Sequence, residues 1–332
     1  MQALVLNGYG GSERLSIAEV PQPQPLAGEV RIRVSHAGLN PIDYKMRRGD
    51  MRLIRKLRFP QVMGQECAGV VDAVGLGPCA FAPGDEVFVR LDKDRMGGFA
   101  EYVCDRVENV ALRPKSIAPE VAAGVPLVAL TAWQCLFEKA KLERGQSILI
   151  HGAGGAVGRM AVQFARRAGA VIAATGGEWA EPMVCKMGAS RYIDYRKQRF
   201  DELLDKYDVV LDLVGADTLD RSFSVVKEGG FVVSIAGMPA PETAAEIGKG
   251  GFMNFLFRVA SRKQLKLARQ TRCSYRYLFM RPDGAQLAEI AKLIDAGEIE
   301  ATIDRVLPLS QFKEAFEMQE SGKTRGKLVF AI

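Results

Sequence analysis

The stretch SILIHGAGGAVGRMAVQFARR, residues 147–167, decides the fold of this 332-residue chain. A short aliphatic run leads into a glycine-rich turn, and apolar residues at helical spacing follow the turn. Gly152, Gly155 and Gly158 stand three residues apart. Glycines let the backbone approach a pyrophosphate closely, and the helix start supplies amide donors. The stretch predicts a dinucleotide-binding turn, although close helix–strand packing alone is another explanation for the glycines.

Short apolar runs and helical segments alternate on both sides of this turn. The runs with the character of buried strands are VIAAT (171–175), RYID (191–194), DVVLDLV (208–214) and GGFVVSIAG (229–237). Strands that alternate with helices form a parallel sheet that helices cover on both faces. We therefore expect an α/β fold with a doubly wound parallel sheet, a Rossmann domain, over residues 121–269.

The first 120 residues have a different pattern. Their β-branched runs are bounded by Gly, Pro and Asp, at residues 3–6, 29–39, 66–75 and 85–90. This pattern predicts a second, antiparallel and partly closed β-domain over residues 1–120. Beyond residue 270 the chain alternates again between helical segments and short strands.

Composition narrows the class of protein. Apolar residues make up 48% and charged residues 25% of the chain, a balance typical of globular proteins. The net charge of +6 suits an anionic cofactor. The sequence contains no dense basic run with interleaved aromatic residues, so it does not indicate nucleic acid as a partner. The start of the sequence lacks the pattern of a signal peptide, and no stretch is long and apolar enough to span a membrane. We expect a cytoplasmic protein without a membrane partner.

The end of the second strand bears on the choice between NADPH and NADH. Sites that prefer NADH usually place an acidic residue there, to bind the ribose 2′-hydroxyl. This chain has Thr175 and Gly176 instead, with Glu178 slightly further on. Arg196, next to Tyr195, is a candidate cation for the 2′-phosphate of NADPH, although a solvated turn is an equal alternative. NADPH is therefore the expected cofactor, with NADH still open. The cofactor residues expected on this domain are Gly152, Gly155, Ala156, Val157, Gly158, Thr175, Gly176, Tyr195 and Arg196.

A basic stripe lies beyond the Rossmann pattern. Arg258, Arg262, Lys266 and Arg269 recur at helical spacing and so share one face of a helix. A lid or a surface for an anionic partner is one interpretation. A solvated helix face is the other, and charge patterning favours it.

An ordered set of motifs carries a resemblance to a known family. The motifs are residues 36–49 (HAGLNPIDYKMRRG), 63–71 (MGQECAGVV), 97–103 (GGFAEYV), 125–133 (VPLVALTAW), 151–166, 208–215, 277–287 and 321–329. The chain resembles the medium-chain dehydrogenase/reductase superfamily, in its zinc-independent quinone oxidoreductase and enone reductase branch. The resemblance implies a GroES-like β-barrel domain (residues 1–120, completed by about 270–332) and the Rossmann domain, with the cofactor between them. It also implies a homodimer.

The same resemblance bears on zinc. Zinc-dependent relatives carry a cysteine where this chain has Asn40 and a histidine where it has Gln65. Neither amide supplies the thiolate or imidazole that zinc prefers. The six cysteines are scattered without a C-x-x-C pair, and the structural zinc lobe is absent. A zinc-type alcohol dehydrogenase is therefore the disfavoured alternative.

Without a metal, hydrogen-bond donors must polarise the carbonyl oxygen of the substrate. The resemblance points to Lys45 and Asn40 as catalytic candidates, and to Thr131 and Lys327 as residues that line the nicotinamide or the cleft. Lys45 as a plain surface charge is an equal alternative. We expect Asp43 to be a turn or capping residue, in an extended segment that places Tyr44 opposite Lys45.

Two classes of function remain open. The first is an NADPH-dependent oxidoreductase that transfers hydride to a quinone or an α,β-unsaturated carbonyl. The second is a non-catalytic NADPH-binding protein, since relatives include lens crystallins, RNA-binding proteins and assembly factors. The glycine-rich turn fits both classes, so it does not separate them.

Overall fold

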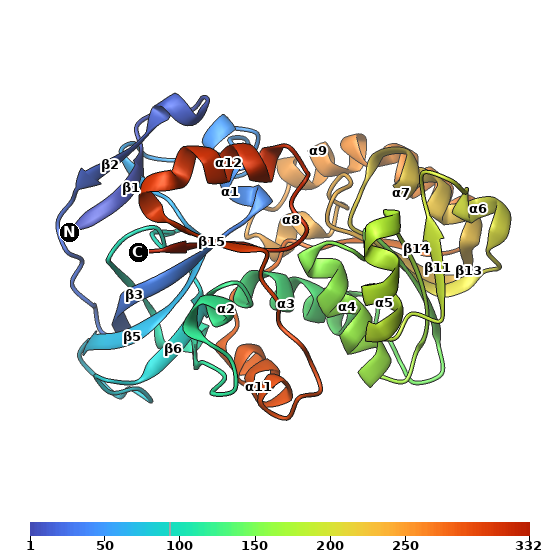
Figure 1. Ribbon diagram of the computed structural model, residues 1–332. Helices are drawn as coiled ribbons and strands as arrows, with labels where there is room; N and C mark the ends of the chain where they lie inside the picture. The colour runs from blue at the N-terminus through green and yellow to red at the C-terminus, as the bar shows by residue number, and fades with distance from the viewer. Residues whose placement is uncertain (93) are drawn as a thin grey trace. The chain divides into compact units, whose positions relative to one another are not determined.

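A computed structural model describes residues 1–92 and 94–332 and divides the chain into two compact units (Figure 1). One unit comprises residues 1–130 and 281–332, and the other comprises residues 131–280. The boundaries expected from the sequence, near 120 and 270, fall about ten residues earlier. Helix α2 (Pro119–Ala123) packs on strands of the first unit, and β14 (Ser274–Tyr277) is a strand of the second. No helix in the described part of the chain is long and apolar enough to cross a bilayer.

The second unit is built on a parallel sheet of six strands. Their order is β11-β10-β9-β12-β13-β14, and every neighbouring pair is parallel. The strands are β9 (Ser147–His151), β10 (Val171–Gly176), β11 (Arg191–Asp194), β12 (Tyr207–Asp212), β13 (Val226–Ser234) and β14. The order reverses direction between β9 and β12, which makes this the switch point of a doubly wound sheet. The expected Rossmann topology is confirmed.

Helices cover this sheet. The principal ones are α4 (Ala156–Arg167) on β9 and β10, α5 (Glu181–Met187) on β11, α7 (Ala216–Ser222) on β12 and β13, and α10 (Arg262–Gln270) on β14. Crossovers between parallel strands are right-handed, so helices that belong to opposite sides of the switch point cover opposite faces. The other helical elements of this unit are η3 (Gln134–Lys139), η4 (Glu178–Ala180), α6 (Phe200–Leu203), η5 (Phe223–Val225), α8 (Thr243–Glu246) and α9 (Phe252–Ala260).

The first unit holds two sheets. A small sheet has the order β2-β1-β4, from β2 (Leu15–Glu19), β1 (Gln2–Leu6) and β4 (Gln61–Val62). The larger sheet has the order β15-β16-β3-β5-β6-β8, and β7 also pairs with β3. Its strands are β15 (Arg305–Pro308), β16 (Leu328–Ala331), β3 (Glu29–Leu39), β5 (Glu66–Val74), β6 (Glu86–Arg90), β8 (Val110–Leu112) and β7 (Tyr102–Arg106).

The end of the chain completes this larger sheet. Strand β16 pairs antiparallel with β3. The sequence analysis expected residues from about 270 to 332 to complete the β-domain in this way. Val30, Ile32 and Val34 of β3 point into the core in the alternation of a half-buried strand. The helices of this unit are η1 (Ser12–Arg14), α1 (Pro41–Arg48), η2 (Val107–Asn109), α2, the start of α3 (Pro126–Trp133), α11 (Gly284–Asp295), η6 (Leu309–Gln311) and α12 (Phe312–Glu320).

Candidate functional site

The glycine-rich turn joins β9 to α4 at the switch point of the sheet. Gly152 has φ +71°, a conformation that favours glycine, and the Ala153 amide donates to the Thr175 carbonyl at 3.0 Å. Gly155, at the N-cap of α4, has an ordinary extended backbone with φ −75°. Because the first amides of a helix have no partner within the helix, this turn presents donors and the positive end of the helix dipole.

Packing explains some of these glycines but not Gly155. A Cβ at Gly158 would lie 2.4 Å from the Gly152 carbonyl oxygen, and a Cβ at Gly154 would lie 2.6 Å from the Cβ of Ala180. A Cβ at Gly155 would meet only the Gly152 oxygen, at an ordinary 3.4 Å, and this residue is exposed. Gly158 is therefore required for the helix to cross the strand, whereas the space at Gly155 is open to a ligand.

Ala156 and Val157 continue the turn into the first residues of α4, where both are half-buried. Ala156 is not among the non-glycine residues with positive φ, so its side chain causes no backbone strain in the turn. The sequence prediction of a turn that could hold a pyrophosphate therefore agrees with the backbone geometry.

A second turn lies against the first at the same edge of the sheet. A Cβ at Gly152 would come within 3.3 Å of Cγ2 of Val214, in the turn after β12. Asp212, fully buried, fixes that turn, because its carboxylate accepts from the Val214 amide at 3.1 Å, the Gly215 amide at 2.9 Å and the Ser234 hydroxyl at 2.7 Å. Burial raises the pKa of Asp212 and these donors oppose the rise. Sequence reasoning missed this residue, although an aspartate at a strand end before a glycine is a turn signal.

Thr175 lies at the end of β10, where the sequence analysis placed it, and its role in binding the cofactor stays a prediction. We expected this residue to line the cofactor, but its side chain is buried and its Oγ1 lies 2.9 Å from Nδ1 of His151. The hydroxyl of Thr175 is therefore occupied inside the protein, and its main-chain carbonyl accepts from the Ala153 amide. Thr131 is also buried, in α3, and its role stays a prediction.

His151 sits beneath the turn as a neutral imidazole. Its ring is fully buried against Phe200, with the ring centroids 4.4 Å apart, and Nε2 has no hydrogen-bond partner. Burial, followed by the nearby charge of Arg221, lowers its pKa from 6.5 to about 3. The native state therefore takes up this proton only at a much lower pH than the unfolded chain does.

This difference predicts acid sensitivity. Below pH 6.5 the unfolded chain binds the His151 proton and the native state does not, so the free energy of unfolding falls as the pH falls. Between pH 7.5 and pH 5 the loss from this residue should be about 2 kcal/mol. Urea unfolding of the native protein and of His151→Gln at both pH values measures it. An equal pH dependence in the two proteins would contradict the assignment.

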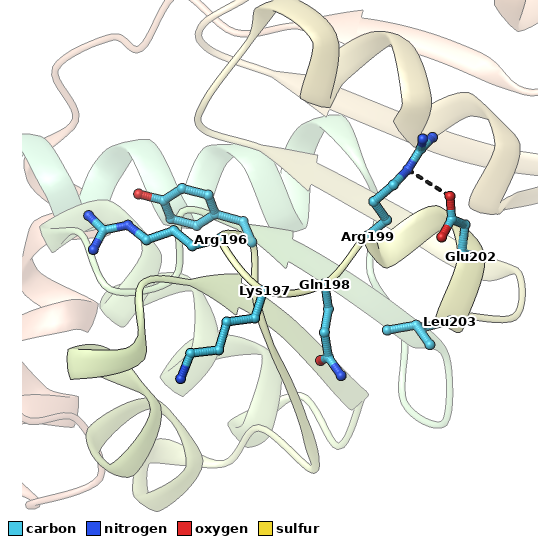
Figure 2. A pocket seen from close by; sticks show the side chains of 7 residues that line it. Arg196, Lys197, Gln198, Arg199, Glu202 and Leu203 are labelled. Carbon is cyan, nitrogen blue, oxygen red and sulfur yellow. Dashed lines mark ion pairs between the residues drawn. The ribbon is translucent and has the colours of Figure 1, made fainter.

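The loop after β11 adds cations at the edge of the same sheet. Figure 2 shows its side chains around a pocket of about 460 Å³, which Tyr195, Arg196 and Lys197 help to line. The Tyr195 amide donates to the Gly176 carbonyl at 3.2 Å, which joins this loop to the end of β10. Tyr195 is 60% exposed, and the guanidinium of Arg196 lies 5.6 Å from the centre of its ring.

The carboxylate that would favour NADH is engaged elsewhere. Lys197 pairs with the exposed Glu178 at 2.9 Å. Gly176 has no space for a side chain, because a Cβ there would lie 2.2 Å from the Tyr192 hydroxyl oxygen. The expected residues Gly176, Tyr195 and Arg196 are thus brought together on one side of the second unit.

In the first unit, the segment with Tyr44 and Lys45 is helical, and the prediction of an extended segment is wrong. Asn40 precedes Pro41 at the start of α1, and the Asp43 carboxylate accepts from the main-chain amide of Asn40 at 2.8 Å. A proline in the first turn, with an acceptor two residues later, is a helix-start signal that the sequence analysis overlooked. The capping role expected for Asp43 is confirmed. Lys45 is exposed on this helix, and Tyr44 is half-buried.

Asn40 and Lys327 belong to a buried polar cluster with Glu66. The Lys327 ammonium contacts both the Asn40 side-chain oxygen and a Glu66 carboxylate oxygen. The Asn40 amide nitrogen donates to Glu66 at 2.8 Å and to the Gly38 carbonyl at 3.2 Å, and the Leu127 amide donates to Glu66 at 2.6 Å. All the polar groups of the Asn40 side chain are therefore engaged within the protein, against the expectation that it donates to a ligand.

Asp43 extends this cluster. Its side chain is fully buried, and one carboxylate oxygen has no hydrogen-bond partner. Burial raises the pKa of Asp43 to about 7. The main-chain amide of Asn40 and the charge of Lys327 oppose this rise. Across the described residues, no three His, Cys, Asp or Glu side chains gather as metal ligands.

The cluster predicts a specific energetic coupling. Lys327→Met should cost about 3 kcal/mol of unfolding free energy, because it leaves the Glu66 carboxylate buried without its cation. Adding Glu66→Gln to this variant removes that buried charge and should recover part of the loss. Denaturant unfolding of both single variants and the double variant measures the coupling. Strictly additive losses would contradict a direct pair between Lys327 and Glu66.

Known proteins resemble this chain in sequence over both units. Two family profiles match: "Alcohol dehydrogenase GroES-like domain" over residues 26–115 and "Zinc-binding dehydrogenase" over residues 187–330. The chain is 33% identical to the mitochondrial NAD(P)H oxidoreductase RTN4IP1 of Mus musculus, over all of this chain and 89% of that protein. It is 31% identical to a chloroplastic NADPH-dependent alkenal/one oxidoreductase of Arabidopsis thaliana, over 99% of this chain and 79% of that protein.

A solved structure extends the likeness to the whole fold. The Escherichia coli quinone oxidoreductase complexed with NADPH matches over all of both chains, with a TM-score of 0.82 and 26% identity. The chain belongs to the medium-chain dehydrogenase/reductase superfamily, in its quinone and enone reductase branch. It is an oxidoreductase of the nicotinamide-dependent type, and the β-rich first unit is a GroES-like domain.

Proposed function

We propose that this reductase takes NADPH and delivers hydride to a quinone or an α,β-unsaturated carbonyl, without zinc. The observation that carries the proposal is the open space at Gly155, at the N-terminus of α4 and beside the switch point of the sheet. A pyrophosphate fits there, because the first amides of α4 have no partner within the helix and a Cβ at Gly155 would meet only the Gly152 carbonyl oxygen, to which the Gly155 amide itself donates at 3.0 Å. When bound, the nicotinamide supplies the hydride, and the protein supplies orientation and electrostatics.

The preference for NADPH rests on charge at the end of β10. No acidic side chain occupies the end of that strand, and Lys197 neutralises Glu178 close by. Arg196 is the cation that would meet a 2′-phosphate, with Tyr195 beside it. A phosphate dianion gains from a guanidinium, and the two carboxylates nearby, Glu178 and Asp194, both pair with the Lys197 ammonium. The relative from Arabidopsis thaliana carries NADPH in its name.

Zinc independence is supported by what surrounds Asn40. Beside Asn40, the ammonium of Lys327 already balances the buried charge of Glu66. Gln65, the other position that differs from zinc-dependent relatives, is buried with its amide nitrogen 3.0 Å from the sulfur of Met46. An amide pair with a resident ammonium is a poor set of ligands for zinc.

Polarisation of the substrate oxygen falls to Lys45 in this proposal. Hydride added to the β-carbon of an enone leaves negative charge on the carbonyl oxygen, and an ammonium that donates to that oxygen lowers the barrier. Lys45 is exposed and so is available to a ligand. The side-chain amide of Asn40 is not available, because it already donates to Glu66 and to the Gly38 carbonyl. We therefore assign Asn40 to positioning the start of α1 rather than to donation.

The function is tested directly by the acceptor. Purified protein is mixed with NADPH and a panel of quinones, alkenals and enones, and the absorbance of the reduced nicotinamide is followed. Consumption with at least one acceptor, faster with NADPH than with NADH, is the expected result. Binding of NADPH without consumption by any acceptor would favour a non-catalytic cofactor-binding protein. Stoichiometric zinc in the purified protein would favour the alcohol dehydrogenase alternative.

Gly155→Val tests the placement of the cofactor. The new side chain should enter open space, so thermal stability should stay nearly unchanged, while NADPH affinity falls at least a hundredfold through obstruction of the pyrophosphate. Gly158→Val is the contrast, because its Cβ meets backbone at 2.4 Å and should destabilise the fold itself. Fluorescence titration and thermal unfolding separate the two effects. Full NADPH affinity in Gly155→Val would contradict the site.

Lys45→Met tests the proposed donor. Turnover should fall by about a hundredfold with little change in NADPH affinity, because the lost interaction forms as charge develops. Lys56→Met, at another exposed lysine of the same unit, is the matched control and should keep full turnover. Equal kcat in the two variants would remove Lys45 from the mechanism.

Two further expectations stay predictions: a homodimer and a cytoplasmic location. The names of the two relatives given above place those proteins in mitochondria and chloroplasts. Size-exclusion chromatography with light scattering measures the oligomeric state of this chain.

A further inference from the structure

Helix α9 presents its apolar side to solvent. Phe252, Phe255 and Val259 are 73%, 60% and 50% exposed, and Leu256 is 39% exposed. Their spacing (i, i+3, i+4, i+7) places all four on one face. On the other side of the helix, Phe257 is buried. A surface helix normally turns its apolar face to the core, so this arrangement is the reverse of the usual one.

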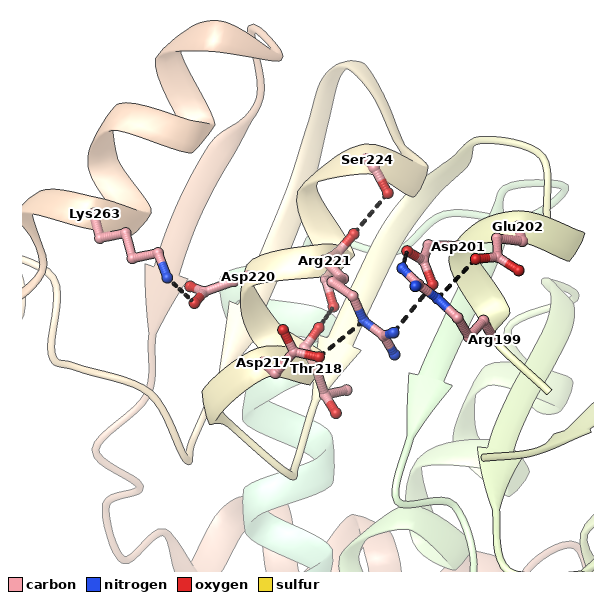
Figure 3. Close-up of polar contacts among 10 residues, drawn as sticks. Arg199, Asp201, Glu202, Asp217, Thr218, Asp220, Arg221, Ser224 and Lys263 are labelled. Carbon is pink, nitrogen blue, oxygen red and sulfur yellow. Dashed lines mark hydrogen bonds and ion pairs between the residues drawn. The ribbon is translucent and has the colours of Figure 1, made fainter. Parts of the chain in front are cut away.

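Helix α10 follows at once and presents cations to solvent. Arg262, Lys266 and Arg269 share its exposed face, and Ala268 is buried on the opposite side. No described residue forms an ion pair with any of these three cations. Lys263, off the centre of this face, is different, because it pairs with Asp220 at 2.6 Å (Figure 3). The expected basic stripe is thus present as an unpaired face.

The two helices follow each other directly in the chain and contact each other. Ser261 ends α9 and begins α10, and its hydroxyl donates to the Phe257 carbonyl at 2.7 Å. Residues 247–282 contain nine Lys and Arg and no Asp or Glu. The whole chain carries a net charge of +6. The positive charge is therefore concentrated here, and the remainder of the chain is net negative.

We propose that these outward faces of α9 and α10, the α9–α10 surface, dock the protein on an anionic lipid membrane. Exposed aromatic and aliphatic side chains, followed directly in the chain by exposed cations, are the chemistry of an interfacial helix. The apolar residues would enter the boundary of the acyl chains, and the cations would meet lipid phosphates. The expectation of no membrane partner rested on spanning segments, and a peripheral surface of this kind departs from it.

Charge argues against two other occupants. In a two-fold symmetric contact between copies, the same patch meets itself, which brings Arg262, Lys266 and Arg269 near their own equivalents. Nucleic acid would satisfy these cations but would leave the aliphatic Leu256 and Val259 without a partner. A lipid surface satisfies both halves, because it offers phosphates and an apolar layer at adjacent depths. The proposal is independent of which acceptor the enzyme reduces.

Vesicle co-sedimentation of the full chain tests this proposal. Vesicles of phosphatidylcholine alone are compared with vesicles that contain phosphatidylglycerol, at low and high salt. We expect binding to the anionic vesicles at least tenfold stronger than to the neutral ones, with a loss at high salt. The variant Arg262→Gln/Lys266→Gln/Arg269→Gln and the variant Phe252→Ser/Phe255→Ser should each weaken binding at least tenfold.

Matched controls remove charge or apolar surface elsewhere. Lys186→Gln/Lys206→Gln/Lys323→Gln deletes three exposed lysines, and Leu76→Ser deletes a side chain that is 85% exposed. Both should bind anionic vesicles as the native protein does, and every variant should keep its thermal stability.

Three results would overturn the proposal. The first is equal vesicle binding by the two α9–α10 variants and their controls. The second is a change of oligomeric state in Phe252→Ser/Phe255→Ser, which would assign the face to a second copy of the chain. The third is stronger binding to duplex nucleic acid than to vesicles, unaffected by the phenylalanine changes.

Discussion

The close crossing of α4 over the end of β9 is the constraint on which the second unit depends. The crossing leaves no room for a side chain at Gly158, where a Cβ would meet backbone at 2.4 Å. It brings the unpaired amides of the helix to the carboxyl edge of the sheet, where neighbouring strands diverge. Gly155, free of such crowding, then becomes the place where an anion can approach. Fold and cofactor chemistry thus share one short turn.

A buried cation has a comparable role in the first unit. Lys327, near the end of the chain, contacts Asn40 and Glu66. Asn40 precedes it by 287 residues in the sequence. The ammonium ties β16 to the start of α1 and balances a carboxylate that would otherwise be buried alone. An ion pair between segments distant in the sequence thus stabilises this part of the fold.

Sequence reasoning predicted what is encoded locally. The glycine turn and the alternation of strands and helices gave the Rossmann topology, because periodicity and turn chemistry act over a few residues. It did not predict that Thr175 would bond His151, or that Asn40 would be engaged by Lys327, since such contacts depend on how distant segments pack. The helical state of residues 41–48 was missed for a different reason: the Asn-Pro start signal was present but was not used. The outward apolar face of α9 also needed the structure, because spacing alone does not reveal which face a helix buries.

The central claim is that main-chain amides around Gly155 hold the diphosphate of NADPH. Hydrogen–deuterium exchange of the protein, with and without NADPH, measures this contact at the backbone itself. The account predicts slower exchange of amides within residues 152–158, and of the loop that carries Arg196, once NADPH is present. Protection that appears only in other segments, with this turn exchanging as fast as before, would contradict it.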